Sequence, residues 1–430
     1  MKNESLPFFG ATALMLSLLG AGAALSQESS GLVAGLRIDN SFEATRNPTL
    51  TAGNDDVRST FNTSLGFSLS SITERAQLEF SAGADLRYSF GDVSSSDEGF
   101  TFGGPYLGLN YAYQTPRASF SSAVTYSRDD LSFLSGSSLV EDSTGEVTIS
   151  DDFGDLTGTG TRENLSYRVS AQFDEDRVFG WGATVSGNVL NYSDIVSTTL
   201  DDSSTFNALL NARFDIAPTI RIDTGLLYAQ GNTDSTDLTS TTTFNVDVTA
   251  VRSDNLSLQA QLGFAFPDDG SERISLTGGL TATPTAQSNF SANAGVVISD
   301  EFDTEIVGRL SYRVQPTSTS QFDFALNSTV TDAVDGGVVL DTTATAGADF
   351  ALTSLTSLSF DAAYAQQRDL ATDTDDSELS SSLQLNRQLT RDWQLSVGAS
   401  STTRWEDGSD SATAQALFVS LGRSWQGGLF

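Results

Sequence analysis

Apolar and polar side chains alternate residue by residue along most of this chain, a pattern that predicts β-strands with one apolar face. The clearest segment runs from Ala76 to Phe90. Its two faces carry Leu78, Phe80, Ala82, Ala84, Leu86, Tyr88 and Phe90 against Gln77, Glu79, Ser81, Gly83, Asp85, Arg87 and Ser89. The alternation recurs over 206–216, 305–314 and 394–404, and no helical period is sustained. The pattern therefore predicts an all-β fold.

The connections between these segments alternate in length. The short ones fall at 71–75, 115–117, 175–177, 217–219, 252–255, 283–287, 316–319, 352–355 and 390–392, and the longer ones at 43–56, 91–99, 128–160, 194–203, 231–240, 332–337 and 367–376. A soluble β-sandwich shows the same alternation along its strands but mixes the lengths of its connections. We expect a transmembrane antiparallel β-barrel of about 20 strands (roughly 18–22), with short periplasmic turns and longer extracellular loops.

Large aromatic residues gather near the ends of the expected strands. Beside the long connections lie Tyr88, Phe90, Phe100, Tyr192, Phe206, Tyr228, Phe264, Phe266 and Tyr364, and beside the short ones Tyr111, Tyr113, Trp181, Phe214, Phe290, Tyr312, Phe322, Phe350 and Trp393. Two aromatic girdles are typical of a membrane barrel, whereas a sandwich places its aromatic residues in mid-strand.

Charge and composition narrow the function classes. The net charge of −33 argues against a nucleic-acid partner, which needs clustered Lys and Arg. The sequence has no His and no Cys, so it lacks the usual general base and every thiolate metal site. We therefore expect no enzyme activity and no cofactor.

The first residues predict a secretion signal. Lys2 precedes an apolar stretch from Leu6 to about Leu25, and Ala24 and Ser26 supply a small-x-small cleavage site. A membrane anchor is the less favoured alternative, because the stretch is short and broken by small residues. We expect a signal peptide over residues 1–26 and one barrel domain over 27–430.

The secretion signal, the strand ladder and the terminal Phe430 together resemble bacterial outer-membrane β-barrels of a porin-like type. The resemblance implies an integral protein of the Gram-negative outer membrane, assembly by the barrel-assembly machinery, and contact with outer-membrane lipid and lipopolysaccharide. An even number of strands places both termini on the periplasmic side.

The last strand departs from the pattern of such barrels. They usually end with apolar or aromatic residues at alternate positions back from a terminal Phe, but Leu417, Val419, Leu421 and Trp425 lie on the opposite parity from Phe430. Two explanations are open. A bulge at 427–428 shifts the register, or the strand ends near Trp425 and leaves a short tail.

Acidic residues crowd the expected outer loops. They are Asp129, Asp130, Glu141, Asp142, Glu146, Asp151, Asp152, Asp155, Asp201, Asp202, Asp268, Asp269, Asp300, Glu301, Asp303, Asp373, Asp375, Asp376, Glu406 and Asp407. A solvated, mutually repelling surface is the favoured interpretation, and loop-bound divalent cations are the alternative. Asp373, Asp375 and Asp376 are weak metal candidates, since the run lacks the Gly and distal Glu of an EF-hand loop.

A second set of charges lies on the polar parity of the strands and is expected to line a pore. Its members are Glu79, Asp85, Arg87, Arg168, Arg213, Asp215, Arg221, Asp223, Arg309 and Arg313. Opposed charges of this kind tune pore selectivity. Cross-strand ion pairing that stiffens the wall is an equal and compatible reading.

The longest connection, 128–160, either folds inward as a constriction, which we favour slightly, or stands outside as an extra hairpin. About 20 strands leave a lumen too wide for side chains to fill. We therefore expect a channel for passive diffusion of small hydrophilic solutes, with cation preference from its acidic loops. A structural or export barrel of an envelope polysaccharide or surface-interaction system is the alternative, and the sequence leaves the oligomeric state open.

Overall fold

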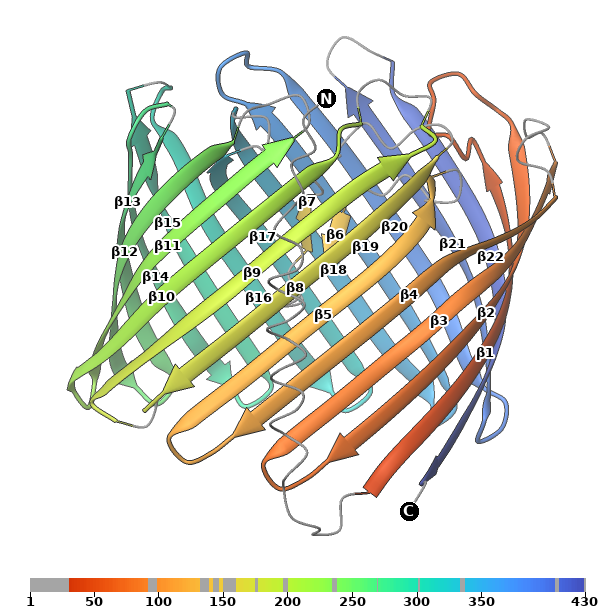
Figure 1. Ribbon diagram of the computed structural model, residues 1–430, viewed down its shortest axis with the longest axis horizontal. Coiled ribbons are helices and arrows are strands. Elements are labelled where there is room, and N and C mark those ends of the chain that lie inside the picture. The colour runs from red at the N-terminus through yellow and green to blue at the C-terminus, as the bar shows by residue number, and fades with distance from the viewer. Residues whose placement is uncertain are drawn as a thin grey trace, which may run out of the picture.

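A computed structural model describes residues 31–428, apart from 92–98, 132–138, 142–146, 150–159, 175–176, 196–199, 234–237, 269, 301, 333–336 and 407–409. Twenty of its strands form one closed antiparallel sheet, and two short strands form a separate hairpin. The prediction of an all-β antiparallel barrel of about 20 strands is confirmed. Figure 1 shows the long strands inclined across the wall and arranged side by side around the barrel.

The strands of the wall follow the chain order closely. Their bounds are β1 (Gly31–Arg46), β2 (Val57–Ile72), β3 (Ala76–Gly91), β4 (Gly99–Gln114), β5 (Ala118–Asp130), β8 (Thr161–Phe173), β9 (Phe179–Ser193), β10 (Ser203–Ala217), β11 (Ile220–Thr233), β12 (Thr239–Ser253), β13 (Leu256–Pro267), β14 (Arg273–Thr285), β15 (Ser288–Ser299), β16 (Glu305–Thr317), β17 (Ser320–Asp332), β18 (Val338–Thr353), β19 (Thr356–Asp369), β20 (Asp375–Gln388), β21 (Trp393–Glu406) and β22 (Ala412–Gly428). Strands β6 (Leu139–Glu141) and β7 (Val147–Ile149) form the separate hairpin inside the connection from β5 to β8.

The last strand closes the barrel by pairing with the first. The register between β1 and β22 runs without a shift from Val33 opposite Gly428 to Arg46 opposite Gln415. Both explanations offered for the last strand are therefore wrong: there is no bulge at 427–428, and the strand continues beyond Trp425. An uninterrupted ladder is favoured here, because bulging either partner would leave backbone groups unpaired at the seam. Phe430 and the expected signal peptide, 1–26, lie outside the described residues.

The two ends of the barrel differ as the connection lengths predicted. Two to four residues join β2 to β3, β10 to β11 and β20 to β21 at one end, whereas five or more join β1 to β2, β5 to β8 and β9 to β10 at the other. We call them the turn end and the loop end. Among the described residues, no helix is long and apolar enough to cross a membrane.

The outer face of the wall is apolar and exposed. Phe100 and Ile306 are about three-quarters exposed at 77% and 75%, and Leu65, Leu210 and Leu417 are more than half exposed. Exposure on this scale is unfavourable in water, but it is favourable against hydrocarbon. The fold is thus built to bury its apolar side chains in lipid rather than in a core.

Aromatic pairs mark both ends of this apolar band. Tyr88 contacts Phe90 and Phe100 at the loop end, with ring centroids 5.8 and 4.7 Å apart. At the turn end, Phe173 stacks on Trp181 with centroids 4.5 Å apart. The wall therefore carries the two aromatic girdles that the sequence predicted.

On the inner face, one tyrosine lies in a slot made by glycines. Tyr106 of β4 is opposite Gly83 of β3, which in turn is opposite Gly66 of β2. A Cβ added to Gly83 would lie 2.6 Å from Tyr106 Cζ, and one added to Gly66 would lie 3.1 Å from the tyrosine hydroxyl. The ring thus reaches across two strands because neither neighbour has a side chain.

We expect Gly83→Ala to destabilise the barrel by about 1–3 kcal/mol, because the added methyl group must displace the Tyr106 ring. Urea-induced unfolding in lipid vesicles measures the change. Gly225→Ala is the matched control, since its Cβ would be 3.6 Å from Leu209 Cδ1, an ordinary contact. Equal stability of the two variants would contradict the account of the slot.

Candidate pore

The polar parity of the strands faces the inside of the barrel. On β3, Leu86 and Phe90 are 46% and 41% exposed on the outer face, whereas the side chains of Asp85 and Arg87, on the other parity, are 17% and 16% exposed. The wall is a single closed sheet, so side chains opposite to the lipid-facing set point into the lumen.

Several of the residues expected to line a pore are joined in ion pairs. Arg87 Nη2 donates to Asp85 Oδ2 at 2.8 Å, and Arg313 pairs across strands with Asp323. Most of these pairs retain some exposure to the lumen, so each contributes modestly to stability. These ion pairs hold the long arginine side chains against the wall.

Four expected residues converge on β10 and β11. Arg213 lies opposite Asp223, and Asp215 lies opposite Arg221. Asp215 accepts from Arg213 Nη2 at 2.5 Å and from Arg221 Nε at 3.4 Å. The structure therefore brings together residues that the sequence could only place on one parity.

The other expected residues lie apart on the wall. Gln77 Nε2 donates to Glu79 at 2.7 Å on β3, Arg168 lies on β8 between Ala123 and Ser186, and the backbone N–H of Arg309 donates to Asn293 Oδ1 at 2.7 Å. Across the described strands, the residues expected to line a pore are thus distributed around the barrel rather than gathered in one site.

Further carboxylates on the polar parity extend this set of inward charges. Asp247 of β12 is directly opposite Asp223 of β11, and Asp349 and Asp361 lie on the neighbouring strands β18 and β19. The ion pairs seen among the described residues include none of these four carboxylates, Asp223, Asp247, Asp349 and Asp361. The alternation of β12 contains the signal for Asp247, but that strand's register had to be known before its partner could be identified.

Polar contacts at the loop end join strands that are not neighbours. Both terminal nitrogens of Arg273, on β14, donate to Asp332, on β17, with Nη2 to Oδ2 at 2.6 Å. Thr241 of β12 donates to the same carboxylate at 2.8 Å. Arg368 of β19 pairs with Glu305 of β16 at 2.7 Å. We call these five residues the mouth clasp.

The mouth clasp requires the wall to bend inward at this end. β12 and β17 are five positions apart in the sheet, and a circular wall of 20 strands would separate such strands by more than roughly 20 Å. Arg273 is only 8% exposed although it starts a lumen-facing row. Sequence reasoning missed the clasp, because the two residues that Asp332 contacts are 59 and 91 residues away from it in the chain.

The hairpin of β6 and β7 lies across the lumen from β5 and β8, the two strands of the wall that its connection joins. Cα atoms of β7 approach those of β18 to within 8 Å. β18 is ten positions from β8 in a closed wall of 20 strands, so it belongs to the opposite side. Figure 1 likewise draws β6 and β7 within the outline of the barrel.

The structure does not gather the weak metal candidates into a ligand set. Asp373, Asp375 and Asp376 lie at the connection from β19 to β20, where the Asp369 carboxylate accepts from the backbone N–H groups of Ala371 and Thr372 at 2.8 Å. No group of three or more acidic residues close enough to hold a metal ion occurs within the described part of the chain. Many of the acidic loop residues fall outside it.

Comparison with known proteins gives a likeness of fold. No family model matches the chain, and no curated protein matches it in sequence. The siderophore receptor PirA from Acinetobacter baumannii is 8% identical, with a TM-score of 0.53 over 93% of this chain and 81% of that one. A mutant of the ferric enterobactin receptor PfeA from Pseudomonas aeruginosa is 9% identical, with a TM-score of 0.52 over the same shares. OccK5 (OpdH) from Pseudomonas aeruginosa is 12% identical, with a TM-score of 0.42 over 92% of this chain and 98% of that one.

At such low identity, likeness establishes architecture alone. The closed wall, its lipid-facing apolar band and the likeness to the PirA and PfeA receptors together show that the chain has the fold of a bacterial outer-membrane β-barrel. The activity of this chain does not follow from the neighbours.

We expect Asp332→Ala to release the part of the mouth clasp that joins β12, β14 and β17 and to widen the loop end there, because Arg273 and Thr241 lose their shared acceptor. Spin labels on cysteines introduced at Leu238 and Val330 would report this as a longer distance, and the chain has no native cysteine to interfere. Asp303→Ala is the control for loss of a loop charge. An unchanged distance in the Asp332 variant would contradict the clasp.

Proposed function

We propose that this protein is an outer-membrane, porin-like channel for passive diffusion of small hydrophilic solutes. The observation that carries the proposal is a closed wall of 20 strands whose inward positions are polar and charged. In this proposal the loop end is extracellular, both termini are periplasmic, and the chain carries out no catalysis.

The size of the wall supports an open path. A circular barrel of 20 strands is roughly 40 Å across between backbones, which wall side chains alone cannot fill. The hairpin of β6 and β7 and the mouth clasp narrow this space from within and from one end. Solutes would therefore pass beside the hairpin, which acts as the constriction.

The charges on the wall support a preference for cations. Arginines near the turn end are held in ion pairs with Asp215 and Asp323, while Asp223 and Asp247 face each other on adjacent strands and add negative charge. Rings and rows of carboxylates attract cations into a pore.

We expect the purified protein to conduct in planar bilayers with a reversal potential that favours cations over anions in a salt gradient. The double variant Asp223→Asn/Asp247→Asn should shift this potential towards zero, because it removes two lumen carboxylates without changing side-chain shape. Asp303→Asn, at the loop end, is the control. A wild-type protein that does not conduct, or that prefers anions, would contradict the proposal.

Replacing residues 136–152 with a short Gly-Ser linker should increase single-channel conductance several-fold, because it removes the hairpin from the lumen. The linker preserves the connection from β5 to β8, so heat-modifiable gel mobility should still report a folded barrel. Unchanged conductance in a folded variant would show that the hairpin does not form the constriction.

A further inference from the structure

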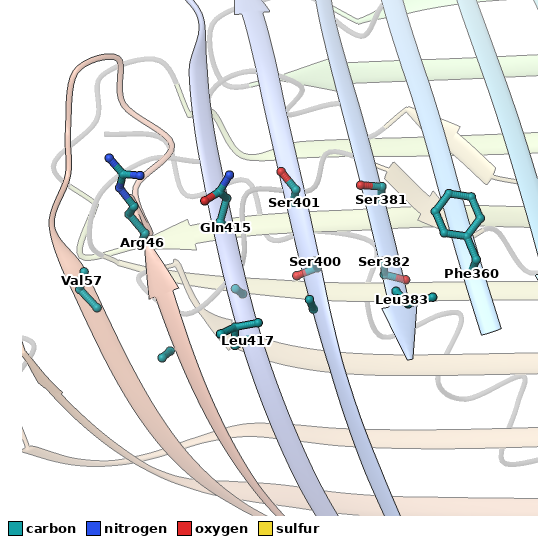
Figure 2. Close-up of a pocket in the computed structure, with 13 residues that line it drawn as sticks. Arg46, Val57, Phe360, Ser381, Ser382, Leu383, Ser400, Ser401, Gln415 and Leu417 are labelled. Carbon is teal, nitrogen blue, oxygen red and sulfur yellow. The ribbon is translucent and has the colours of Figure 1, made fainter. Parts of the chain in front are cut away.

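The lipid-facing wall carries a groove unrelated to the lumen. It has a volume of about 520 Å³ and crosses the neighbouring strands β19, β20, β21, β22, β1 and β2. Figure 2 shows its lining, with Arg46 and Gln415 at one side and Phe360 at the other. Because this side of the sheet is the apolar side, whatever fills the groove lies within or beside the bilayer.

The floor of the groove alternates small and large side chains. One row of opposed residues runs Ala44, Leu417, Ala399, Leu383 and Phe360, from β1 to β19. Ala399 is small and lies between Leu417 and Leu383, so the row has a depression there rather than a smooth surface. Four strand spacings make it about 19 Å long, which suits an extended acyl chain.

The next row towards the loop end is polar. It runs Arg46, Gln415, Ser401 and Ser381 on the same outer face. Arg46 is the last residue of β1, whereas Ser381 lies in the middle of β20. The groove therefore descends obliquely from a cation at the loop end to apolar side chains in mid-wall.

Arg46 is accessible to a ligand at the head of the groove. Its side chain is 57% exposed, and it forms an ion pair at 2.5 Å with Asp55, a loop residue that is 79% exposed. Such an exposed pair is weak, so an anionic headgroup can compete with Asp55. In a chain of net charge −33, an arginine at the head of an apolar groove complements an anion.

We propose that the groove binds a phosphate-bearing lipid of the surrounding bilayer, with the phosphate at Arg46 and one acyl chain along the row from Ala44 to Phe360. The polar head, the apolar floor and the oblique descent match a single amphiphile. This proposal rests on the membrane location in the proposed function, but not on conduction through the lumen.

Native mass spectrometry of the delipidated, full-length barrel in detergent tests the site, with diphosphoryl lipid A and phosphate-free diacylglycerol as probes. We expect one lipid A to bind tightly. Ala399→Phe/Ser401→Phe should abolish binding of both probes by filling the groove. Ala208→Phe, an outward position on the far wall, is the matched control and should bind as wild type.

Two charge variants test the position of the headgroup. Arg46→Gln should weaken lipid A binding about fivefold, the effect of one interfacial cation, and leave diacylglycerol unchanged. Asp55→Asn should strengthen lipid A binding by removing the competing carboxylate. The fold of each variant is checked by heat-modifiable mobility.

Three results would overturn the proposal. These are lipid A binding that survives filling of the groove, lipid A binding that is unaffected by Arg46→Gln, or a lipid-free dimer that the groove-filling variant dissociates. The last result would make a second copy of the chain the occupant. Lipid binding without conductance would instead remove only the channel function, so the two failures are distinguishable.

Discussion

In hydrocarbon, every backbone N–H and C=O group needs a partner within the protein, and this constraint underlies the architecture of this barrel. A sheet meets it only by closing on itself. The pairing of β22 with β1 over fourteen positions, from Val33 to Arg46, completes that closure. The same seam places the start of β1 and the end of β22 side by side at the turn end.

Closure also divides the side chains into two sets, one that faces lipid and one that faces the lumen. Outward residues such as Phe100 and Ile306 have no packed core to enter, and they are stabilised by the bilayer instead. Inward residues meet water and one another. They pair within a strand, as Asp85 and Arg87 do, or across strands, as Arg313 and Asp323 do. Stability and the electrostatics of the lumen therefore come from the same residues.

The proposed functions depend on the places where the wall departs from uniformity. The mouth clasp draws strands five positions apart together, and the hairpin of β6 and β7 lies close to β18, on the side opposite β8. On the outside, alanines at positions 44 and 399 open a groove beneath Arg46. Each departure combines side chains from strands that are distant in sequence, and each changes the width or the surface of the barrel.

The sequence by itself determined the strands, their lipid-facing parity, the two kinds of connection and the aromatic girdles. These are local properties, since a few neighbouring residues determine both the alternation with a period of two and the turns. Even so, the sequence misjudged the last strand, because the terminal Phe430 suggested a register that the pairing with β1 does not adopt. Only the tertiary structure decided that pairing, the position of the hairpin against β18, the contacts of Asp332 with Arg273 and Thr241, and the facing of Asp223 and Asp247. The physical reason is closure, because the curvature of the closed wall decides which residues meet across the barrel. The local sequence pattern does not determine that curvature.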